Sequence, residues 1–536
     1  MKPRLAVATA ICLLTLLTFV QFPGHLYLQS DTQIYIPILE QLWDPTVLAK
    51  DLIVEKPHVA FTLYDEAALA LRWATGLDFH DVLKMQQAIF RALGVLGVFL
   101  VATRLGLSTA LSLLVAAIVS LGAIVVGPSV LSIEYEPVPR GFAVPLVLLA
   151  VGLAAHGRHV VASMAGAIAF LYHPPTAASF WGVYLCFAVA RRRWIVLASL
   201  LSAAAVLWIA SRLQAGPAEP HMLFTRIDSE LRELQRMRAS YNWVSLWNAE
   251  FIRHHIVIWL ASAVACWRLW NVMPRDLRWF AAGLPALGIA SMPFSYVSLE
   301  LAGWSLIPQF QPMRALLFCT VFAVLLGSIA AFHAVLARRY WEGMAWLALA
   351  YLIPANTLVT RLPSTERIAV VLSLAALACV AAAAETSRRR WAPVLIAAAA
   401  VAPFFAIPMI GGVQNYSSPT NGELVGLADW ARLSTPKDAV FLFPEAEREL
   451  HPGVFRATAL RAVYVDWKGG GQVNYFRSLA EKWWSRWQAT MEAPFDSSLR
   501  KYADLGIDYV ILNREPRLAR PPVFENAQYA VYSTRP

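Results

Sequence analysis

Several short segments of the chain carry polar side chains that could move a proton or bind a phosphate. The first is LQSDTQIYIPILEQLW, in which Asp31 follows an apolar run at the N-terminus. A carboxylate at this position could take the proton from an incoming hydroxyl group. Asp31 would also suit the N-cap of a helix over residues 32–43, and the two roles are compatible. Asp31 is therefore our candidate catalytic residue.

The segment EYEPVPR combines two carboxylates, Glu134 and Glu136, with Arg140. Together these side chains could help to bind a pyrophosphate or a metal ion. Glu136 is the candidate metal ligand, because Mg²⁺ and Mn²⁺ take hard oxygen donors. An ordinary polar turn whose two prolines end the flanking helices would give the same pattern.

Three further segments place a cationic or polar side chain where a phosphate could bind. His173 in YHPPTAA could donate a hydrogen bond to a phosphate, or it could be a structural histidine. Arg314, preceded by Gln311 in QFQPMRALLF, offers a guanidinium fork that suits two phosphate oxygens, or lipid headgroups. Lys468 precedes three glycines that would allow close approach to a phosphate or sugar, although a plain surface loop fits equally.

The elements that position these residues must be membrane helices. The chain of 536 residues is 58% hydrophobic and only 15% charged, whereas soluble domains are about 25% charged. Many of its apolar runs approach the length of about 20 residues that a helix needs to cross a bilayer. We predict thirteen spans, at residues 5–22, 88–103, 107–127, 141–156, 159–172, 176–190, 194–211, 256–271, 279–297, 314–336, 341–359, 367–385 and 391–411.

Charge at the junctions between these spans predicts their orientation. Basic residues occur at every second junction, for example Arg191-Arg192-Arg193, Arg338-Arg339 and Arg388-Arg389-Arg390. The positive-inside rule then places the N-terminus in the cytoplasm and the C-terminus outside. This rule also accounts for much of the net charge of +10, so we expect no binding of nucleic acid.

Most of the mass of the predicted loops lies on the outward side. Loop 1 spans residues 23–87, and the loop at about 212–255 has a charged helical pattern that we expect to lie along the membrane surface. Residues 1–411 form the predicted membrane domain. Residues 412–536 are polar and alternate between helix and strand patterns, which predicts a small outward α/β domain. The predicted fold is thus mainly α, a polytopic helical membrane protein with this small domain at its C-terminus.

The arrangement resembles the GT-C class of membrane glycosyltransferases. Members carry an acidic residue in the first outward loop, use a polyprenyl-phosphate-linked sugar as donor, and often end in a soluble outward domain. The resemblance implies that Asp31 corresponds to the catalytic carboxylate and that Arg314 could hold the donor phosphate. EPVPRGFAVPL, YHPPTAA and QPMRALLF also look like segments of bacterial GT-C-like proteins.

Two departures from the GT-C pattern limit what the resemblance implies. Residues 30–32 read Ser-Asp-Thr instead of containing an adjacent acidic pair, and no WWDYG box is present, because EKWWSRW shares only the tryptophans. The departures argue against an oligosaccharyltransferase and leave metal dependence open.

We therefore expect a bacterial inner-membrane glycosyltransferase. It would move a sugar, with inversion, from a polyprenyl-phosphate donor to an envelope acceptor on the outward face. A flippase for a lipid-linked saccharide and a non-catalytic assembly subunit are the alternatives. A flippase predicts ionisable residues deep within the spans, and few are present. An assembly subunit predicts that Asp31, Arg140, His173 and Arg314 do not converge in space.

Overall fold

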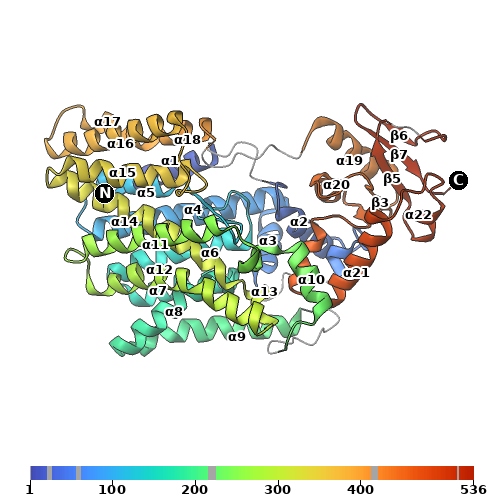
Figure 1. Ribbon diagram of the computed structural model, residues 1–536, viewed down its shortest axis with the longest axis horizontal. Coiled ribbons are helices and arrows are strands. Elements are labelled where there is room, and N and C mark those ends of the chain that lie inside the picture. Colours follow the sequence, from blue (N-terminus) through green and yellow to red (C-terminus); the bar gives the residue numbers. More distant parts are fainter. Residues whose placement is uncertain are drawn as a thin grey trace.

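The computed structural model describes residues 2–20, 27–55, 62–214, 225–411, 420–515 and 518–535. A long bundle of helices forms one end of the molecule, and a smaller part built on a β-sheet forms the other (Figure 1). The described N-terminus lies on the bundle and the C-terminus lies at the far edge of the sheet. Shorter helices from several chain segments fill the region between the two parts.

The bundle contains a helix in every one of the thirteen predicted spans, and two short helices share the last one. Its helices are α1 (Lys2–Val20), α4 (Phe79–Arg104), α5 (Thr109–Val119), α6 (Pro139–Ala155), α7 (His159–Tyr172), α8 (Pro174–Arg191), α9 (Leu197–Leu213), α11 (Ala249–Leu269), α12 (Arg275–Ser295), α14 (Leu316–Leu336), α15 (Tyr340–Ala355), α16 (Thr365–Thr386), α17 (Ala392–Val401) and α18 (Pro403–Met409). Among the described residues, seven helical segments are long and apolar enough to cross a membrane. The protein is a multi-pass helical membrane protein, while the number of crossings and their orientation stay predictions.

Packing inside the bundle follows from the composition of its helices. Helix α14 is apolar on all sides, and nearly all of its residues are buried, so it forms the centre of the bundle. Helices α4 and α6 cross closely at glycines, since a Cβ atom added to Gly97 would lie only 2.4 Å from the backbone of Leu148. This close crossing fixes the position of α6, whose first turn carries Arg140.

Two predicted spans differ from the observed elements. The span predicted at 88–103 starts nine residues earlier, because α4 begins at Phe79 within the predicted loop 1. We expected residues 107–127 to form one span, but α5 ends at Val119. A short antiparallel hairpin of β1 (Ile124–Val125) and β2 (Val130–Leu131) follows. Gly122 and Gly127 adopt positive φ angles of 70° and 82°, which a helix cannot accommodate. Apolar composition alone therefore overestimated the length of this helix.

The C-terminal part is an α/β structure, as predicted. Its sheet has the order β4-β3-β5-β7-β6, in which β4, β3 and β5 are parallel and the last two strands are antiparallel to their neighbours. The strands are β3 (Val440–Leu442), β4 (Ala462–Val463), β5 (Tyr509–Asn513), β6 (Phe524–Glu525) and β7 (Tyr529–Ser533). The helices are α19 (Gly422–Ser434), α20 (His451–Ala459), α21 (Arg477–Trp487) and α22 (Arg500–Asp504), with a 3-10 turn, η7 (Gly469–Asn474). The predicted domain boundary after residue 411 adjoins residues 412–419, which lie outside the described residues.

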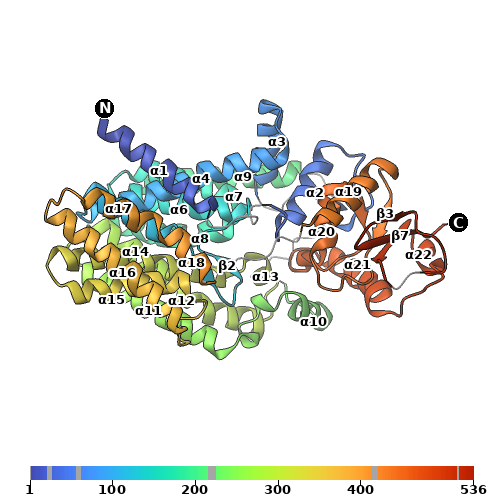
Figure 2. The same ribbon diagram turned by 90° about the horizontal axis from the view of Figure 1, so that it is seen from above.

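Segments from the loops of the bundle pack directly on the C-terminal part (Figure 2). Loop 1 contributes α2 (Thr32–Trp43) and the 3-10 turn η1 (Leu52–Glu55), while its helix α3 (Tyr64–Thr75) packs on α2 and α4. Ile36 and Leu39 of α2 share one apolar core with Phe441 and Phe455. Helix α10 (Ser229–Arg238), which we expected along the membrane surface, packs one face on η7 and α21.

A buried ion-pair network strengthens the contact between loop 1 and the C-terminal part. Nε of Arg456 lies 2.7 Å from Asp51, and Nη2 of Arg456 lies 2.6 Å from Asp466. All three side chains are almost completely buried. Losing one member of such a network would leave a buried charge without compensation, so the network favours one docked arrangement.

Candidate functional site

A cavity of about 610 Å³ lies where the bundle, its loops and the C-terminal part meet. Many of its lining residues are apolar: Phe170, Leu207 and Trp208 come from helices of the bundle, and Leu306 and Phe310 from the short helix α13 (Leu306–Phe310). Other lining residues are polar or charged. Its ionisable side chains are those of Asp31, Arg140, His173, Arg238, Arg314 and Lys468, with three tyrosines at 35, 241 and 475. A cavity lined by both apolar and cationic side chains suits an amphipathic anion.

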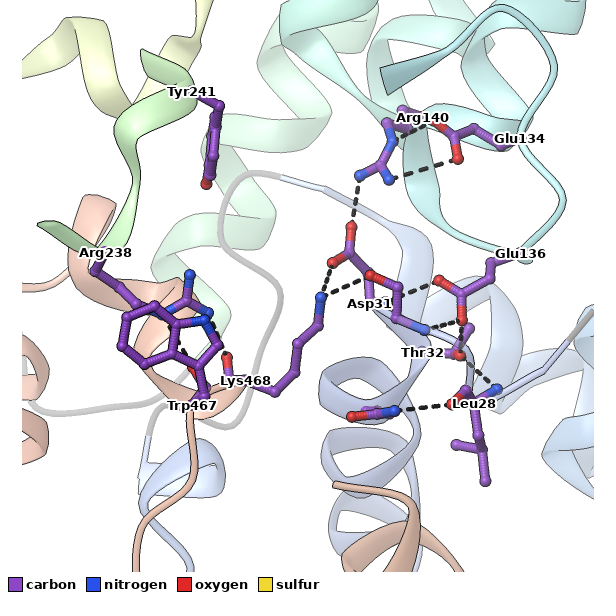
Figure 3. Close-up of polar contacts among 12 residues, drawn as sticks. Leu28, Asp31, Thr32, Glu134, Glu136, Arg140, Arg238, Tyr241, Trp467 and Lys468 are labelled. Atoms are coloured by element: carbon purple, nitrogen blue, oxygen red, sulfur yellow. Dashed lines mark hydrogen bonds and ion pairs between the residues drawn. The ribbon is translucent and has the colours of Figure 1, made fainter. Parts of the chain in front are cut away.

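Asp31 is the carboxylate that lines this cavity in the described part of the chain. It stands directly before α2, at the N-cap position, but its side chain makes no capping hydrogen bond. The side chain instead turns toward two cations: Oδ1 lies 2.6 Å from Nζ of Lys468, and Oδ2 lies 2.7 Å from Nη1 of Arg140 (Figure 3). The side chain of Asp31 therefore lines the cavity and does not cap α2, while its role as a base stays a prediction.

The two cations control the charge of Asp31. Burial by itself would raise the pKa of this carboxyl, but the positive charges of Lys468 and Arg140 and their hydrogen bonds outweigh burial. Together they hold the pKa of Asp31 well below its usual range. In this arrangement Asp31 is a stable carboxylate with both oxygens engaged.

Glu136 lies behind Asp31 and holds its backbone in place. Oε1 of Glu136 accepts hydrogen bonds from the amide of Ser30 at 2.7 Å and from the hydroxyl of Thr32 at 2.5 Å. Oε2 accepts a hydrogen bond from the amide of Asp31 at 2.8 Å. Burial and the nearby charge of Asp31 raise the pKa of Glu136. Glu136 does not line the cavity among the described residues, so its geometry fits a positioning role.

Arg140 joins Asp31 to Glu134. Its Nε lies 2.6 Å from Oε1 of Glu134, which also accepts a hydrogen bond from the amide of Leu131 at 3.2 Å. Arg140 is the second residue of α6 and follows Pro139, whose fixed φ suits the first turn of a helix. The β1–β2 hairpin and the start of α6 thus place this guanidinium beside Asp31, while Glu134 lies behind the arginine and outside the cavity lining.

Lys468 reaches the cavity from the C-terminal part. It follows β4 and directly precedes η7, whose glycines allow close packing: a Cβ atom on Gly470 would lie 2.5 Å from the ring of Trp483. Besides Asp31, Nζ of Lys468 contacts Oγ of Ser30 at 2.8 Å. The C-terminal part therefore supplies a charged group to a site that otherwise belongs to the bundle and its loops.

Arg314 and His173 face the cavity without an acidic partner among the described residues. Nε of Arg314 is buried and has no hydrogen-bond partner in that part of the chain, and the guanidinium lies 5.9 Å from the centre of the Tyr241 ring. His173 accepts the amide hydrogen of Thr176 at Nδ1, which leaves Nε2 as the protonated nitrogen of the neutral ring. Burial, with the charges of Arg314 and Arg140, lowers the pKa of His173. Both groups are therefore hydrogen-bond donors available to a ligand.

Gln311 supports Arg314 from outside the cavity lining. It adopts the left-handed conformation at φ 50°, and its carbonyl accepts the amide hydrogen of Arg314 at 3.0 Å. The side chain of Gln311 is buried, and its Oε1 has no partner among the described residues. The structure thus brings Asp31, Arg140, His173, Arg314 and Lys468 to one cavity and places Glu134, Glu136 and Gln311 behind it.

Sequence reasoning missed Arg238 and Tyr241. Nε of Arg238 donates to the carbonyl of Trp467 at 2.9 Å, and its guanidinium lies 4.6 Å from the centre of the Trp467 ring. Both missed residues belong to the charged loop segment that we assigned to the membrane surface. Only its excess of arginine could have indicated an anion site.

The donors around the cavity do not fit a divalent cation. Each oxygen of Asp31 already faces a cation, and both oxygens of Glu136 accept hydrogen bonds from loop 1. A divalent ion would also stand among four cationic side chains, those of Arg140, Arg238, Arg314 and Lys468. Mg²⁺ or Mn²⁺ bound by Glu136 stays a prediction from the sequence, and we derive no reaction step through it. A cluster of Asp78, His80 and Asp81 at the start of α4 lies outside this lining.

Comparison with solved structures identifies the fold. The chain is similar over its full length to ArnT from Cupriavidus metallidurans bound to undecaprenyl phosphate, with 11% identity, a TM-score of 0.50 and coverage of 98% of that chain. The chain has a GT-C fold. The resemblance that the sequence suggested is thus confirmed at the level of the fold.

Weaker similarities complete the comparison. The arabinofuranosyltransferase AftD from Mycobacteria matches at 16% identity and a TM-score of 0.43, over 97% of this chain and 36% of that one. The oligosaccharyltransferase from Archaeoglobus fulgidus matches at 12% identity and a TM-score of 0.43, over 95% of this chain and 69% of that one. Residues 423–490 match a sequence family described as a domain of unknown function, DUF6798. No curated protein matches the sequence.

Proposed function

We propose that this protein is a glycosyltransferase of a bacterial inner membrane. It would transfer a sugar from a polyprenyl-phosphate donor to an envelope acceptor on the outward face. The observation that carries the proposal is the cavity itself, which one carboxylate and four cationic side chains line together with many apolar residues. The fold supports the same class of function, because ArnT, which has the same fold, was solved with undecaprenyl phosphate bound.

Both the polyprenyl chain and the phosphate of the donor would occupy the cavity. Its polyprenyl chain would follow the apolar lining near α9, where Leu207 and Trp208 face the cavity. Its phosphate would bind Arg314 and Nε2 of His173, because neither has an acidic partner in the described part of the chain. A guanidinium and an N–H donor aimed at one phosphate would stabilise the negative charge that develops as the glycosidic bond breaks.

Asp31 would act as the general base. The oxygen of the acceptor hydroxyl would attack the anomeric carbon of the sugar while its proton moves to the carboxylate of Asp31. The bond between the anomeric carbon and the phosphate oxygen would break, and polyprenyl phosphate would leave with one more negative charge. A displacement in one step inverts the anomeric centre. Positioned acid–base groups typically contribute about 10²–10⁴-fold to the rate of such a step.

The convergence of the candidate residues supports an enzyme over a non-catalytic assembly subunit. That alternative predicted that Asp31, Arg140, His173 and Arg314 would lie apart, whereas all four line one cavity. A flippase remains distinguishable by experiment, because it would bind a lipid-linked saccharide without breaking the glycosidic bond.

The test is transfer by the purified protein with a panel of polyprenyl-phosphate sugars, in the wild type and in Asp31→Asn. We expect release of polyprenyl phosphate by the wild type and a reduction of about 10²-fold or more in the variant. Lys482→Gln is the matched control, since its lysine pairs with Glu55 on the surface, away from the cavity lining. Saccharide binding without release of polyprenyl phosphate by the wild type would favour a flippase. Wild-type turnover in Asp31→Asn would remove the assigned role of Asp31.

A further inference from the structure

The ion pair between Asp31 and Lys468 conflicts with the proposed role of Asp31 as a general base. A general base must present a free lone pair to the acceptor hydroxyl. In the structure, Oδ1 of Asp31 is 2.6 Å from Nζ of Lys468, and Oδ2 is 2.7 Å from Nη1 of Arg140. Both oxygens accept charge-assisted hydrogen bonds, which are about twice as strong as neutral ones. The arrangement is therefore a resting state in which the carboxylate is masked.

The two partners of Asp31 differ in how freely they can leave it. Arg140 is held on its other side by Glu134, at 2.6 Å from Nε, and belongs to the first turn of α6. Lys468 has Asp31 as its charged partner, and its other side-chain contact is the hydroxyl of Ser30 at 2.8 Å. A lysine side chain rotates about four bonds, whereas a guanidinium held on both sides cannot turn without breaking a second ion pair. Lys468 is the partner that can move.

The backbone of Lys468 is anchored, so a change of partner would involve only its side chain. Arg238 donates to the carbonyl of Trp467 at 2.9 Å, and Asp466 accepts the amide hydrogen of Gly469 at 3.1 Å. Figure 3 shows the lysine extending from this anchored turn to the carboxylate of Asp31. Lys468 lines the same cavity as Arg314 and His173, the two donors without an acidic partner there. A phosphate held by those donors would stand in the same cavity as the ammonium group.

We infer that Lys468 of the C-terminal part masks Asp31 in the resting protein, and that the phosphate of a bound polyprenyl-phosphate ligand unmasks Asp31 by taking the lysine. The inference rests on the proposed function. It makes Lys468 a positioning residue that couples occupation of the phosphate subsite to the availability of the base.

Other charged groups near Asp31 do not replace Lys468 in this role. Glu136 contacts the amide of Asp31 and not its carboxylate, and Arg238 is engaged with backbone carbonyls. Tyr35 and Tyr475 line the cavity, and Arg140 keeps its pair with Glu134. Of the cations that contact Asp31, only Lys468 would change partner when a phosphate arrives.

A double-mutant cycle on binding of polyprenyl phosphate tests the inference without requiring turnover. If Asp31 and the phosphate compete for Lys468, Asp31→Asn binds polyprenyl phosphate more tightly than the wild type, by about tenfold, within the usual range of coupling energies. In the Lys468→Met background the same change at Asp31 has an effect below about threefold, because the contested lysine is gone. Lys482→Gln, which removes a lysine–carboxylate pair between the same two parts of the chain, gives wild-type binding.

The outcomes separate the inference from the proposed function. Equal tightening by Asp31→Asn in both backgrounds would mean simple charge repulsion and would overturn the masking role of Lys468, while the proposed function stands. Unchanged binding in Asp31→Asn would overturn it as well. Absence of polyprenyl phosphate binding by the folded wild type and by Asp31→Asn would overturn both proposals.

Kinetics provide a second readout that a structural role of Lys468 would not change. The acid limb of kcat/KM reports the free protein and that of kcat reports the complex. Masking predicts that the acid limb of kcat lies at higher pH than that of kcat/KM in the wild type, and that the two limbs converge in Lys468→Met. Coincident limbs in the wild type would contradict masking.

Discussion

Replacing Glu136 by glutamine tests whether the loop that carries Asp31 must be held from behind. The wild-type carboxylate accepts hydrogen bonds from the amides of Ser30 and Asp31 and from the hydroxyl of Thr32. A glutamine has the same shape but only one acceptor oxygen. Its amide nitrogen would face either the Asp31 amide or the two donors of Ser30 and Thr32, so at least one buried donor would lose its partner.

The expected cost follows from these contacts. Losing a hydrogen bond to a charged acceptor costs about 1.5–3 kcal/mol. If this free energy is added to the activation barrier of the transfer step, kcat decreases by about 10- to 100-fold. The loss of a negative charge near Asp31 would also make Asp31 a weaker base, which acts in the same direction. The KM for the donor should change less than about threefold, because Glu136 lies outside the cavity lining.

The assay is the initial rate of transfer over a range of donor concentrations, for purified wild type, Glu136→Gln and Glu40→Gln. Glu40→Gln is the matched control, because Glu40 lies in loop 1, as Asp31 does. Glu40 pairs with Arg72 at 3.2 Å, outside the cavity lining. A folded Glu136→Gln protein with a wild-type kcat would refute the positioning role of Glu136. A large rise in KM alone would instead assign Glu136 to binding of the donor.

Three further predictions concern binding, stability and pH. Arg314→Gln should raise the KM for the donor by about 10- to 100-fold with a smaller change in kcat, measured by initial rates, because a charged hydrogen bond to the phosphate is lost; an unchanged KM would contradict its assignment. Arg456→Met leaves the buried carboxylates of Asp51 and Asp466 without their cation. It should lower the free energy of unfolding, measured by denaturant titration, by about 3–5 kcal/mol. An unfolding midpoint equal to that of the wild type would contradict this. The pKa of Asp31 is depressed in the folded protein. The ionised carboxylate therefore stabilises the fold fully at pH values above the ordinary pKa of about 4, and this contribution is lost as the pH falls below that value. The unfolding temperature of Asp31→Asn should thus fall less steeply between pH 6 and pH 3 than that of the wild type, and parallel curves would argue against this.

The sequence by itself determined the class of protein and most of its helices. Hydropathy is a local property, and a run of apolar residues must form a helix in lipid wherever it stands in the fold. The thirteen apolar runs each contain a helix for this reason. Alternation of strand and helix patterns over residues 412–536 likewise predicted an α/β domain, and strands β3 to β7 and helices α19 to α22 lie there. Hydropathy overextended α5, which ends before Gly122 and Gly127.

Only the tertiary structure decided which candidate residues meet. Asp31 and Lys468 are 437 positions apart in the chain, and Asp31 and Arg140 are 109 apart. No local pattern encodes such distances, because they depend on how α2, α6 and η7 pack against one another. The close crossing of α4 and α6 and the buried pairs of Arg456 set that packing.

The same packing gave roles to residues that look alike in the sequence. Glu134 and Glu136 both looked like ligand-binding carboxylates, yet one neutralises Arg140 and the other holds the amides of Ser30 and Asp31. Arg238 looked like part of a surface helix and instead faces the cavity beside Trp467. A side chain's type fixes which bonds it can make, but burial and neighbours decide which of them it makes.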